Sequence, residues 1–276
     1  MRKLRLALVQ MEVVPEVERN LETARKGVKK AAEQGAELVV LPEMFCCLYQ
    51  NSEFVRRKEP KGGQIWQALK EMAADNSVYL VGGSMPEEEG GKIYNTSFIF
   101  DPEGLQIGRH RKVHLFDIDV PGGQQFFESR VFSPGNDVTV VDTAFGKVGV
   151  CLCFDIRFPE LSRIMALQGA EAIIIPAAFN MTTGPAHWEL HFRGRAVDNQ
   201  LFMAGCAPAR DVNGPYVSYG NSIVTDPWGR ILGRLDEKPG ILVQEIDLDE
   251  IKAVREQLPL IKNRRKDLYH IGLSGI

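Results

Sequence analysis

The stretch Gly149-Val150-Cys151-Leu152-Cys153-Phe154-Asp155-Ile156-Arg157-Phe158-Pro159-Glu160-Leu161 decides the fold and points to the chemistry. Residues 147–153 are almost all apolar and follow a glycine, which predicts a buried strand, and Pro159 is typical of the first turn of a helix. Cys153 therefore lies at a strand-to-helix corner, where free backbone N–H groups can lower the pKa of a thiol and receive an oxyanion. Cys153 is a candidate nucleophile; the alternative is a small buried apolar side chain, which is the common fate of a free cysteine.

Outward from this corner, short apolar strands alternate with amphipathic helices. Apolar runs predict strands that are covered on both faces, at residues 6–9, 38–41, 78–81, 148–153 and 172–175. Apolar residues at three-to-four spacing predict helices over 17–31, 65–73 and 161–167. This alternation indicates a layered α/β fold.

Two pairs of segments repeat along the chain. Residues 97–104 and 222–229 are both strands that run into an Asp-Pro-x-Gly turn, 125 positions apart, and each predicts a tight hairpin. Residues 38–43 and 172–177 are both apolar strands that run into a proline. Two similar halves, each a mixed sheet with helices, would pack as a four-layer sandwich; the alternative is a coincidence of two common turns. Because no linker separates the halves, we expect one domain over residues 1–276.

Composition excludes several classes of partner. The net charge of −3 gives no reason to expect nucleic acid or an anionic membrane as a partner. No apolar run approaches the roughly 20 residues of a membrane span, and Gln10 and Glu12 interrupt the N-terminal run, so it predicts a strand and not a signal peptide. The five cysteines are odd in number, which argues against a secreted disulfide framework and favours the cytoplasm.

Ionisable residues follow three of the predicted structural elements. Glu43 follows the strand at 38–41, Lys112 follows the first Asp-Pro-x-Gly hairpin, and Cys153 ends the strand quoted above. Taken singly, Glu43 and Lys112 would be assigned to a solvated surface. Together, the three side chains supply the base, the oxyanion stabiliser and the nucleophile that acyl transfer by a thiol requires.

The sequence resembles the nitrilase superfamily of carbon–nitrogen hydrolases at all three positions, over essentially the whole chain. The matching motifs are Leu-Pro-Glu ending at Glu43, His-Arg-Lys ending at Lys112, and Cys-Phe-Asp-Ile-Arg-Phe-Pro-Glu from Cys153 to Glu160. A second family glutamate matches Glu128. The resemblance implies an αββα sandwich of two mixed sheets, a homodimer, and no metal or organic cofactor.

Further motifs resemble the ω-amidase branch of that superfamily. They lie at residues 114–122, 178–190, 195–200, 218–222, 226–229 and 264–269. The branch hydrolyses the terminal amide of short α-keto dicarboxylic acid monoamides, such as 2-oxoglutaramate and 2-oxosuccinamate, to keto acid and ammonia. In the implied mechanism Glu43 is the base, Lys112 and the Phe154 backbone N–H hold the oxyanion, Glu128 positions Lys112, and Cys153 forms a thioester.

Arg157 is the candidate for binding the far carboxylate of such a substrate, because a guanidinium pairs a carboxylate through two parallel hydrogen bonds. The alternative is an ion pair with Asp155 or Glu160. The resemblance implies the same role for Arg157, with Phe179 and Thr183 lining the pocket and the Tyr49 hydroxyl at its rim.

Other functions compete with this interpretation. Within the same superfamily, an N-carbamoyl-amine hydrolase or a deaminated-glutathione-type amidase would use the same three residues. A non-catalytic binding protein on this scaffold, or a thiol-redox protein built on Cys151 and Cys153, belongs to a different class. His187 and His191 have ligand spacing on a predicted helix, but the HExxH arrangement is absent and we expect no metal. The same expectation covers His110 and His114.

Overall fold

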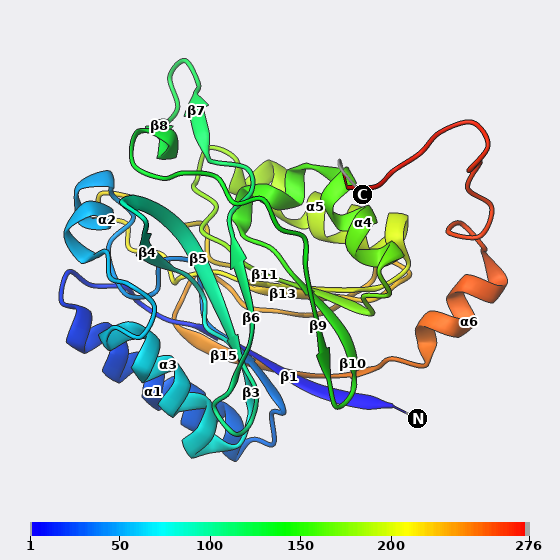
Figure 1. The fold of residues 1–276 in the computed structure, drawn as a ribbon, viewed down its shortest axis with the longest axis horizontal. Helices are drawn as coiled ribbons and strands as arrows, with labels where there is room; N and C mark the ends of the chain where they lie inside the picture. The colour runs from blue at the N-terminus through cyan, green and yellow to red at the C-terminus, as the bar shows by residue number, and fades with distance from the viewer. Residues whose placement is uncertain (1, 274–276) are drawn as a thin grey trace.

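The computed structural model describes residues 2–273 and shows four layers, with helices outside and two mixed β-sheets face to face between them (Figure 1). Helices α1 (Val17–Glu33) and α3 (Gln64–Asn76) cover one sheet. Helices α4 (Pro159–Leu167) and α5 (Gly184–Asn199) cover the other. The predicted αββα sandwich is confirmed. The strand and helix predictions made from the apolar runs are confirmed as well, with small shifts at their ends.

The first sheet has the strand order β15-β1-β2-β3-β5-β4, with β6 paired to β5. Its strands are β1 (Lys3–Gln10), β2 (Leu38–Val40), β3 (Tyr79–Val81), β4 (Met85–Glu89), β5 (Lys92–Phe100), β6 (Gln106–Arg111) and β15 (Gly240–Asp247). The second sheet has the order β14-β13-β12-β11-β10-β9. Its strands are β9 (Thr139–Thr143), β10 (Gly146–Val150), β11 (Ala172–Pro176), β12 (Phe202–Cys206), β13 (Ile223–Thr225) and β14 (Ile231–Arg234).

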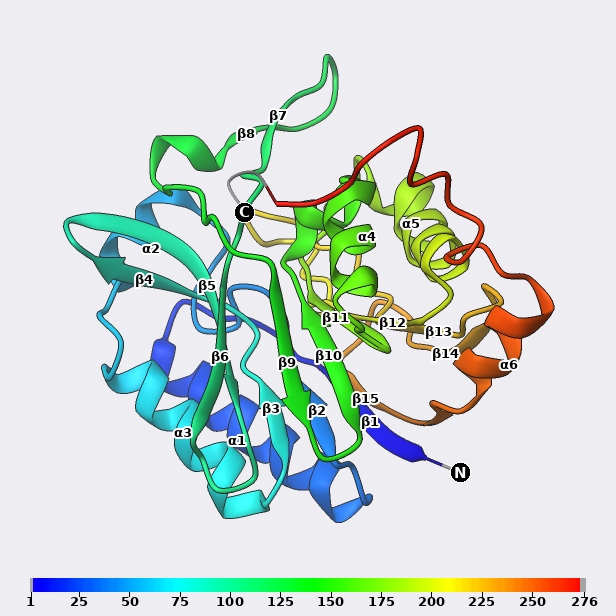
Figure 2. The same cartoon turned by 45° about the vertical axis from the view of Figure 1, so that its right-hand side comes forward.

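Smaller elements complete the fold. A two-stranded ribbon of β7 (Asp117–Asp119) and β8 (Gln125–Phe127) projects from one end of the sandwich (Figure 2). The remaining helices are α2 (Asn51–Arg57), α6 (Glu250–Gln257) and the 3₁₀ helices η1 (Glu128–Arg130) and η2 (Cys153–Arg157). None of the helices within residues 2–273 combines the length and apolarity that crossing a bilayer requires.

The central strands are apolar throughout because each one contributes to two cores. In β1, Leu6 and Leu8 belong to the core between the sheets, whereas Ala7 and Val9 belong to the core beneath α1 and α3. In β11, Ile174 faces the other sheet, and its neighbours on either side face α4 and α5. Side chains alternate between the faces of a strand, so a strand that is covered on both faces needs an apolar residue at every position.

The two halves of the chain have similar structures, including their hairpins. Strands β5–β6 and β13–β14 form the two predicted hairpins, and in each the register shifts once, after Ile99 and after Val224. In each turn the aspartate Oδ1 accepts two backbone N–H groups, and the glycine has a positive φ. Strands β2 and β11 also correspond, because each pairs in parallel with both of its neighbours. The internal repeat is therefore structural and not a coincidence of turns.

Candidate active site

Cys153 is the first residue of η2, three residues after β10 ends, so the predicted strand-to-helix corner is present. Its φ is 42°, in the left-handed region where a residue with a Cβ is strained by about 1–2 kcal/mol. Its side chain is buried. Phe154, the second residue of η2, lies where backbone N–H groups have no partner within a helix. A strained corner of this kind presents a nucleophile beside backbone donors.

Asp155 holds this corner in place. Its buried carboxylate accepts the backbone N–H of Leu152 at 3.0 Å, and it contacts His110 Nε2 at 3.0 Å and His114 Nδ1 at 2.8 Å. The His114 backbone N–H donates to it as well, at 2.9 Å. Burial by itself raises the pKa of Asp155, but the hydrogen bonds from both histidines outweigh burial and hold the pKa below its ordinary value. The carboxylate therefore ties the cysteine corner to the segment that carries Lys112.

Glu43 follows β2 by three residues and reaches the same end of the sandwich. The next residue, Met44, has a φ of 52°, and its N–H donates to Ser84 Oγ at 3.0 Å. Gly83 packs so closely beneath this turn that a Cβ there would lie 2.2 Å from the Pro42 carbonyl oxygen. Glu43 is thus delivered by a tightly packed loop that leaves its carboxylate little freedom.

Lys112 directly follows β6, and its buried ammonium lies between two carboxylates. Its Nζ is 2.9 Å from Glu43 Oε1 and 2.9 Å from Glu128 Oε2. Asn95 on β5 donates to the same Glu43 oxygen at 2.9 Å. Glu43 and Lys112 also interact electrostatically with Cys153, so the structure brings together the predicted catalytic residues Glu43, Lys112, Glu128 and Cys153.

Tyr49 lines the pocket beside Glu43 and not the Cys153 cavity, and its hydroxyl faces the ionic cluster formed by Glu43, Lys112 and Glu128. Its buried hydroxyl donates to Glu128 Oε1 at 2.6 Å and lies 3.4 Å from Glu43 Oε1. Glu128 Oε2 accepts the Phe116 backbone N–H at 2.7 Å. Tyr49 thus belongs to the ionic cluster, because the loop after Glu43 folds back over Glu128.

Burial dominates the electrostatics of the cluster. Burial lowers the pKa of Lys112, but the Glu128 and Glu43 carboxylates outweigh this effect and raise it above its ordinary value, so the ammonium stays charged. Burial raises the pKa of Glu128, although Lys112 opposes the shift. The two carboxylates therefore share one buried ammonium.

The pKa of Cys153 is raised, contrary to the lowering that the helix start suggested. Burial is the main cause, followed by the Glu43 carboxylate; Lys112 and the Ala178 backbone N–H oppose the shift. The cysteine is therefore a neutral thiol before reaction. Glu43 Oε2 is buried and has no nitrogen or oxygen partner among the described residues, which leaves this oxygen for the thiol proton.

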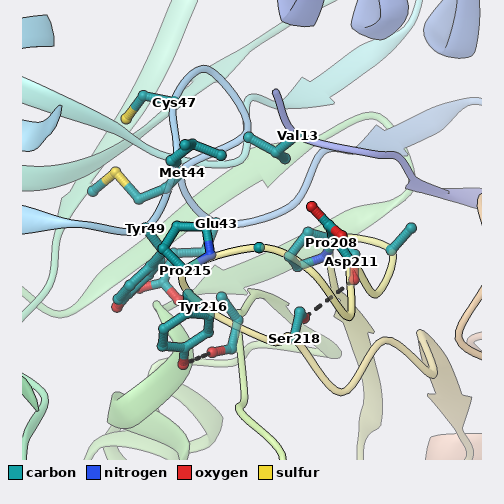
Figure 3. A pocket seen from close by; sticks show the side chains of 14 residues that line it. Val13, Glu43, Met44, Cys47, Tyr49, Pro208, Asp211, Pro215, Tyr216 and Ser218 are labelled. Carbon is teal, nitrogen blue, oxygen red and sulfur yellow. Dashed lines mark hydrogen bonds between the residues drawn. The ribbon is translucent and has the colours of Figure 1, made fainter. Parts of the chain in front are cut away.

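Cys153 opens into a small cavity, and Glu43 borders an adjoining pocket (Figure 3). The residues lining the cysteine cavity are Phe116, Cys153, Phe154, Arg157, Ala178, Phe179, Thr183 and Tyr216. Ala178 and Tyr216 line both spaces, and the Tyr216 hydroxyl donates to the Ala178 carbonyl oxygen. Tyr216 therefore separates the nucleophile's cavity from the pocket beside the base.

Arg157 reaches the cysteine cavity from the last residue of η2. Its Nη1 lies 3.0 Å from His187 Nδ1 and 3.2 Å from His191 Nε2, and its guanidinium stacks on the Phe179 ring at 4.7 Å. Burial lowers its pKa. The alternative ion pair with Asp155 or Glu160 is wrong, because Asp155 is held by His110 and His114, and the Arg157 contacts are the two histidines of α5.

Phe179 and Thr183 lie where the resemblance implied, on the cavity wall. Phe179 packs edge-on against Trp188 with ring centroids 5.1 Å apart. Thr183 precedes α5, and its backbone N–H donates to Asn180 Oδ1 at 3.0 Å.

Sequence reasoning missed Asn95, Asp155 and Tyr216 as parts of the site. Asn95 begins a run of three polar residues, with Thr96 and Ser97, in a strand that is buried from Asn95 onward. Asp155 lies within the quoted stretch, and its two histidines occupy alternate positions on either side of Lys112. Tyr216 lies in a loop that has no periodicity, so only the folded chain reveals it.

The cysteines carry no disulfide in the structure. All five are free and buried, and burial raises the pKa of Cys151 well above its ordinary value. Cys206 belongs to the core between the sheets, as predicted. Nothing in these contacts favours a redox pair of Cys151 and Cys153.

The chain is similar to proteins of known family. The model of the family described as carbon-nitrogen hydrolase matches residues 5–256. The omega-amidase NIT2 of Danio rerio is 48% identical over 272 residues, covering 99% of this chain and 98% of that protein.

Two solved structures are also similar. Saccharomyces cerevisiae Nit3, a member of branch 10 of the nitrilase superfamily, superposes with a TM-score of 0.88 at 41% identity, covering 95% of this chain and 97% of that one. A mutant amidase from Nesterenkonia sp. AN1 shows covalent addition of the acetamide moiety of fluoroacetamide at its active site cysteine. It matches at a TM-score of 0.79 and 27% identity over 96% of this chain and 95% of that one.

Proposed function

Because the chain belongs to the carbon–nitrogen hydrolase family, we propose that it is an ω-amidase that uses Cys153 as its nucleophile. Its substrates are short α-keto dicarboxylic acid monoamides such as 2-oxoglutaramate and 2-oxosuccinamate, and its products are the keto acid and ammonia. The observation that carries this specificity is the Arg157 guanidinium on the wall of the Cys153 cavity. The similarity to omega-amidase NIT2 over almost the full chain supports the same substrate class.

Acylation begins with a neutral thiol, as the raised pKa of Cys153 requires. Glu43 takes the thiol proton on Oε2 as the sulfur attacks the amide carbon. The carbonyl oxygen becomes an oxyanion that accepts hydrogen bonds from Lys112 Nζ and from the Phe154 backbone N–H. Loss of one such donor costs about 3 kcal/mol of barrier in comparable sites.

Collapse of the tetrahedral intermediate breaks the carbon–nitrogen bond. Glu43 returns its proton to the departing nitrogen, ammonia leaves, and a thioester on Cys153 remains. Glu43 then removes a proton from water, which attacks the thioester carbon at the same oxyanion site. Expulsion of the thiolate, which is reprotonated from Glu43, restores the thiol and releases the keto acid.

Glu128 serves this cycle by holding Lys112. Its two oxygens receive the ammonium, the Tyr49 hydroxyl and the Phe116 N–H, so the lysine Nζ has a fixed position. An ammonium between two carboxylates stays charged, as an oxyanion partner must.

Ammonia release from 2-oxoglutaramate by the purified protein tests the proposal, with an N-carbamoyl amine and an uncharged short amide alongside. The proposal is supported if ammonia is released from 2-oxoglutaramate in strong preference to both the N-carbamoyl amine and the uncharged amide. Release only from the N-carbamoyl amine would replace ω-amidase with an N-carbamoyl-amine hydrolase on the same three residues. Cys153→Ala should abolish turnover without loss of the circular dichroism of the folded protein, and retained turnover would refute the nucleophile assignment.

Wider features of the proposal concern assembly and location. A homodimer is supported by exposed apolar side chains on one helical layer, Leu190 and Val197 on α5 and Leu167 on α4. We infer that the chain forms a single domain, because residues 3–10 pair with 240–247 and so join the two ends of the chain in one sheet. We also infer that it works in the cytoplasm, where its five cysteines stay reduced. Light scattering of the purified protein tests the dimer.

A further inference from the structure

The two histidines of α5 meet one nitrogen of Arg157. His187 and His191 are one helical turn apart, and Arg157 Nη1 lies 3.0 Å from His187 Nδ1 and 3.2 Å from His191 Nε2. Arginine can only donate hydrogen bonds, so each of these histidine nitrogens has to be an acceptor without a proton. Both imidazoles are therefore neutral in this arrangement. Burial, followed by the Arg157 charge, lowers the pKa of His191 to about 4, which agrees with a neutral ring.

The remaining donors of Arg157 are unused. Both hydrogens of Nη1 are taken by the histidines, whereas Nε is buried and has no partner among residues 2–273. Nη2 likewise has no hydrogen bond to any described residue. Nε–H and one Nη2–H are parallel and form the edge of a guanidinium that pairs a carboxylate through two hydrogen bonds.

The rest of the surroundings fixes the plane of the guanidinium. The Phe179 ring stacks on it at 4.7 Å, and the Phe154 ring lies 5.6 Å away. The backbone beneath is held by Arg195, also on α5, which donates to the Ile156 and Arg157 carbonyl oxygens at 3.0 and 3.2 Å. Residues of helix α5 thus hold both the backbone of Arg157 and its guanidinium.

We propose that His187 and His191 are positioning residues that hold Arg157 by one nitrogen, so that its opposite edge is presented to the far carboxylate of the substrate. This inference rests on the proposed function and adds two specificity-determining residues to it. The histidines suit the task because a neutral acceptor orients the guanidinium without neutralising its charge, whereas a carboxylate at either position would compete with the substrate.

The test compares variants that lose the acceptor with variants that keep it. His187→Leu and His191→Leu each remove one acceptor. If His191→Leu does not fold, His191→Met is used in its place. His187→Asn places an amide oxygen near the original Nδ1, and His191→Gln places one near the original Nε2. His270→Leu, at an exposed histidine far along the chain, is the matched control. Michaelis constants and kcat are measured for 2-oxoglutaramate and for butyramide, an uncharged amide.

Each acceptor-losing variant should raise the KM for 2-oxoglutaramate by about tenfold, the equivalent of one lost hydrogen bond to a charged group, and change its kcat far less. The amide variants should restore the KM to near the wild-type value, and the KM for butyramide should not follow these changes. An equal rise for both substrates, no rise for either, or no rescue by the amides would overturn the positioning role.

Failure of the underlying function has a different signature. Wild-type protein that hydrolyses butyramide but not 2-oxoglutaramate would refute the ω-amidase proposal, and the histidine role would fall with it. Wild-type turnover of 2-oxoglutaramate with histidine variants that do not discriminate between the substrates would refute the histidine role alone.

Discussion

Replacing Tyr49 with phenylalanine separates the role that the family resemblance implies for its hydroxyl from the role that the structure gives it. A hydroxyl at the pocket rim would contact substrate, so its loss would raise KM. In the structure the hydroxyl donates to Glu128 Oε1 at 2.6 Å inside a buried ionic cluster. Its loss should therefore act on stability and on kcat, and leave KM nearly unchanged.

The expected magnitude follows from the partners that remain. A hydrogen bond to a charged group is worth about 1.5–3 kcal/mol. After Tyr49→Phe, Glu128 Oε1 still accepts Lys112 Nζ at 3.1 Å and Oε2 still accepts the Phe116 N–H, so neither carboxylate oxygen loses its last partner. We expect a loss of about 2 kcal/mol in the free energy of unfolding, in the middle of that range. The position of Lys112 loosens at the same time, and kcat should fall by about tenfold.

Urea unfolding followed by circular dichroism measures the first effect, and initial rates of ammonia release measure the second. Tyr94→Phe is the matched control, because the Tyr94 ring packs against Arg111, outside the ionic cluster, and its loss of a hydroxyl should change stability by less than about 0.5 kcal/mol. A Tyr49→Phe protein with wild-type stability and kcat but a raised KM would refute this reasoning and return the hydroxyl to the substrate.

Three further substitutions test the roles given to residues in and around the active site. Glu43→Gln keeps the side-chain volume but cannot accept the thiol proton, so kcat for ammonia release should fall by about 10³-fold or more while the protein stays folded; a smaller loss would remove Glu43 as the base. Asp155→Asn should lower the free energy of unfolding at neutral pH by about 3 kcal/mol, because one amide cannot accept all the donors that the carboxylate holds. Folding lowers the pKa of Asp155, so this stability is present above the unfolded pKa near 4 and is lost progressively as the pH falls from there through the lowered folded pKa. Urea titrations at pH 7 and pH 3 should therefore show that the stability difference between the wild type and Asp155→Asn shrinks at the lower pH. Cys151→Ala should keep kcat within about twofold, since this side chain packs in the core under α4 and α5; an inactive variant would favour the redox alternative.

Much of the fold could be predicted from local pattern. Continuous apolarity in segments such as 172–175 indicated strands covered on both faces, and the Asp-Pro-x-Gly turns indicated two hairpins. These signals are local because hairpin turns and helix starts depend on a few adjacent residues. The order of strands in each sheet was not available from them, since pairing such as that of β1 with β15 joins residues more than 200 positions apart.

The candidate site could likewise be predicted from the sequence only in part. The residue types and strand-end positions of Glu43, Lys112 and Cys153 follow from the sequence and its family resemblance. Their contacts depend on burial and approach, which local sequence does not encode. Burial turned the expected low pKa of Cys153 into a raised one. The fold also places the Tyr49 hydroxyl in the ionic cluster, and it pairs Arg157 with two histidines and not with an acidic neighbour.

By itself, then, the sequence determined the α/β layering, the repeated hairpins and the set of reactive side chains, because each depends on residues close together in the chain. Only the tertiary structure decided which oxygen of Glu43 is free, which nitrogen of Arg157 is held, and which protonation state each group adopts. Those properties arise where β2, β6, η2 and α5 converge, and electrostatic interactions between buried groups depend on distances that only the folded chain establishes.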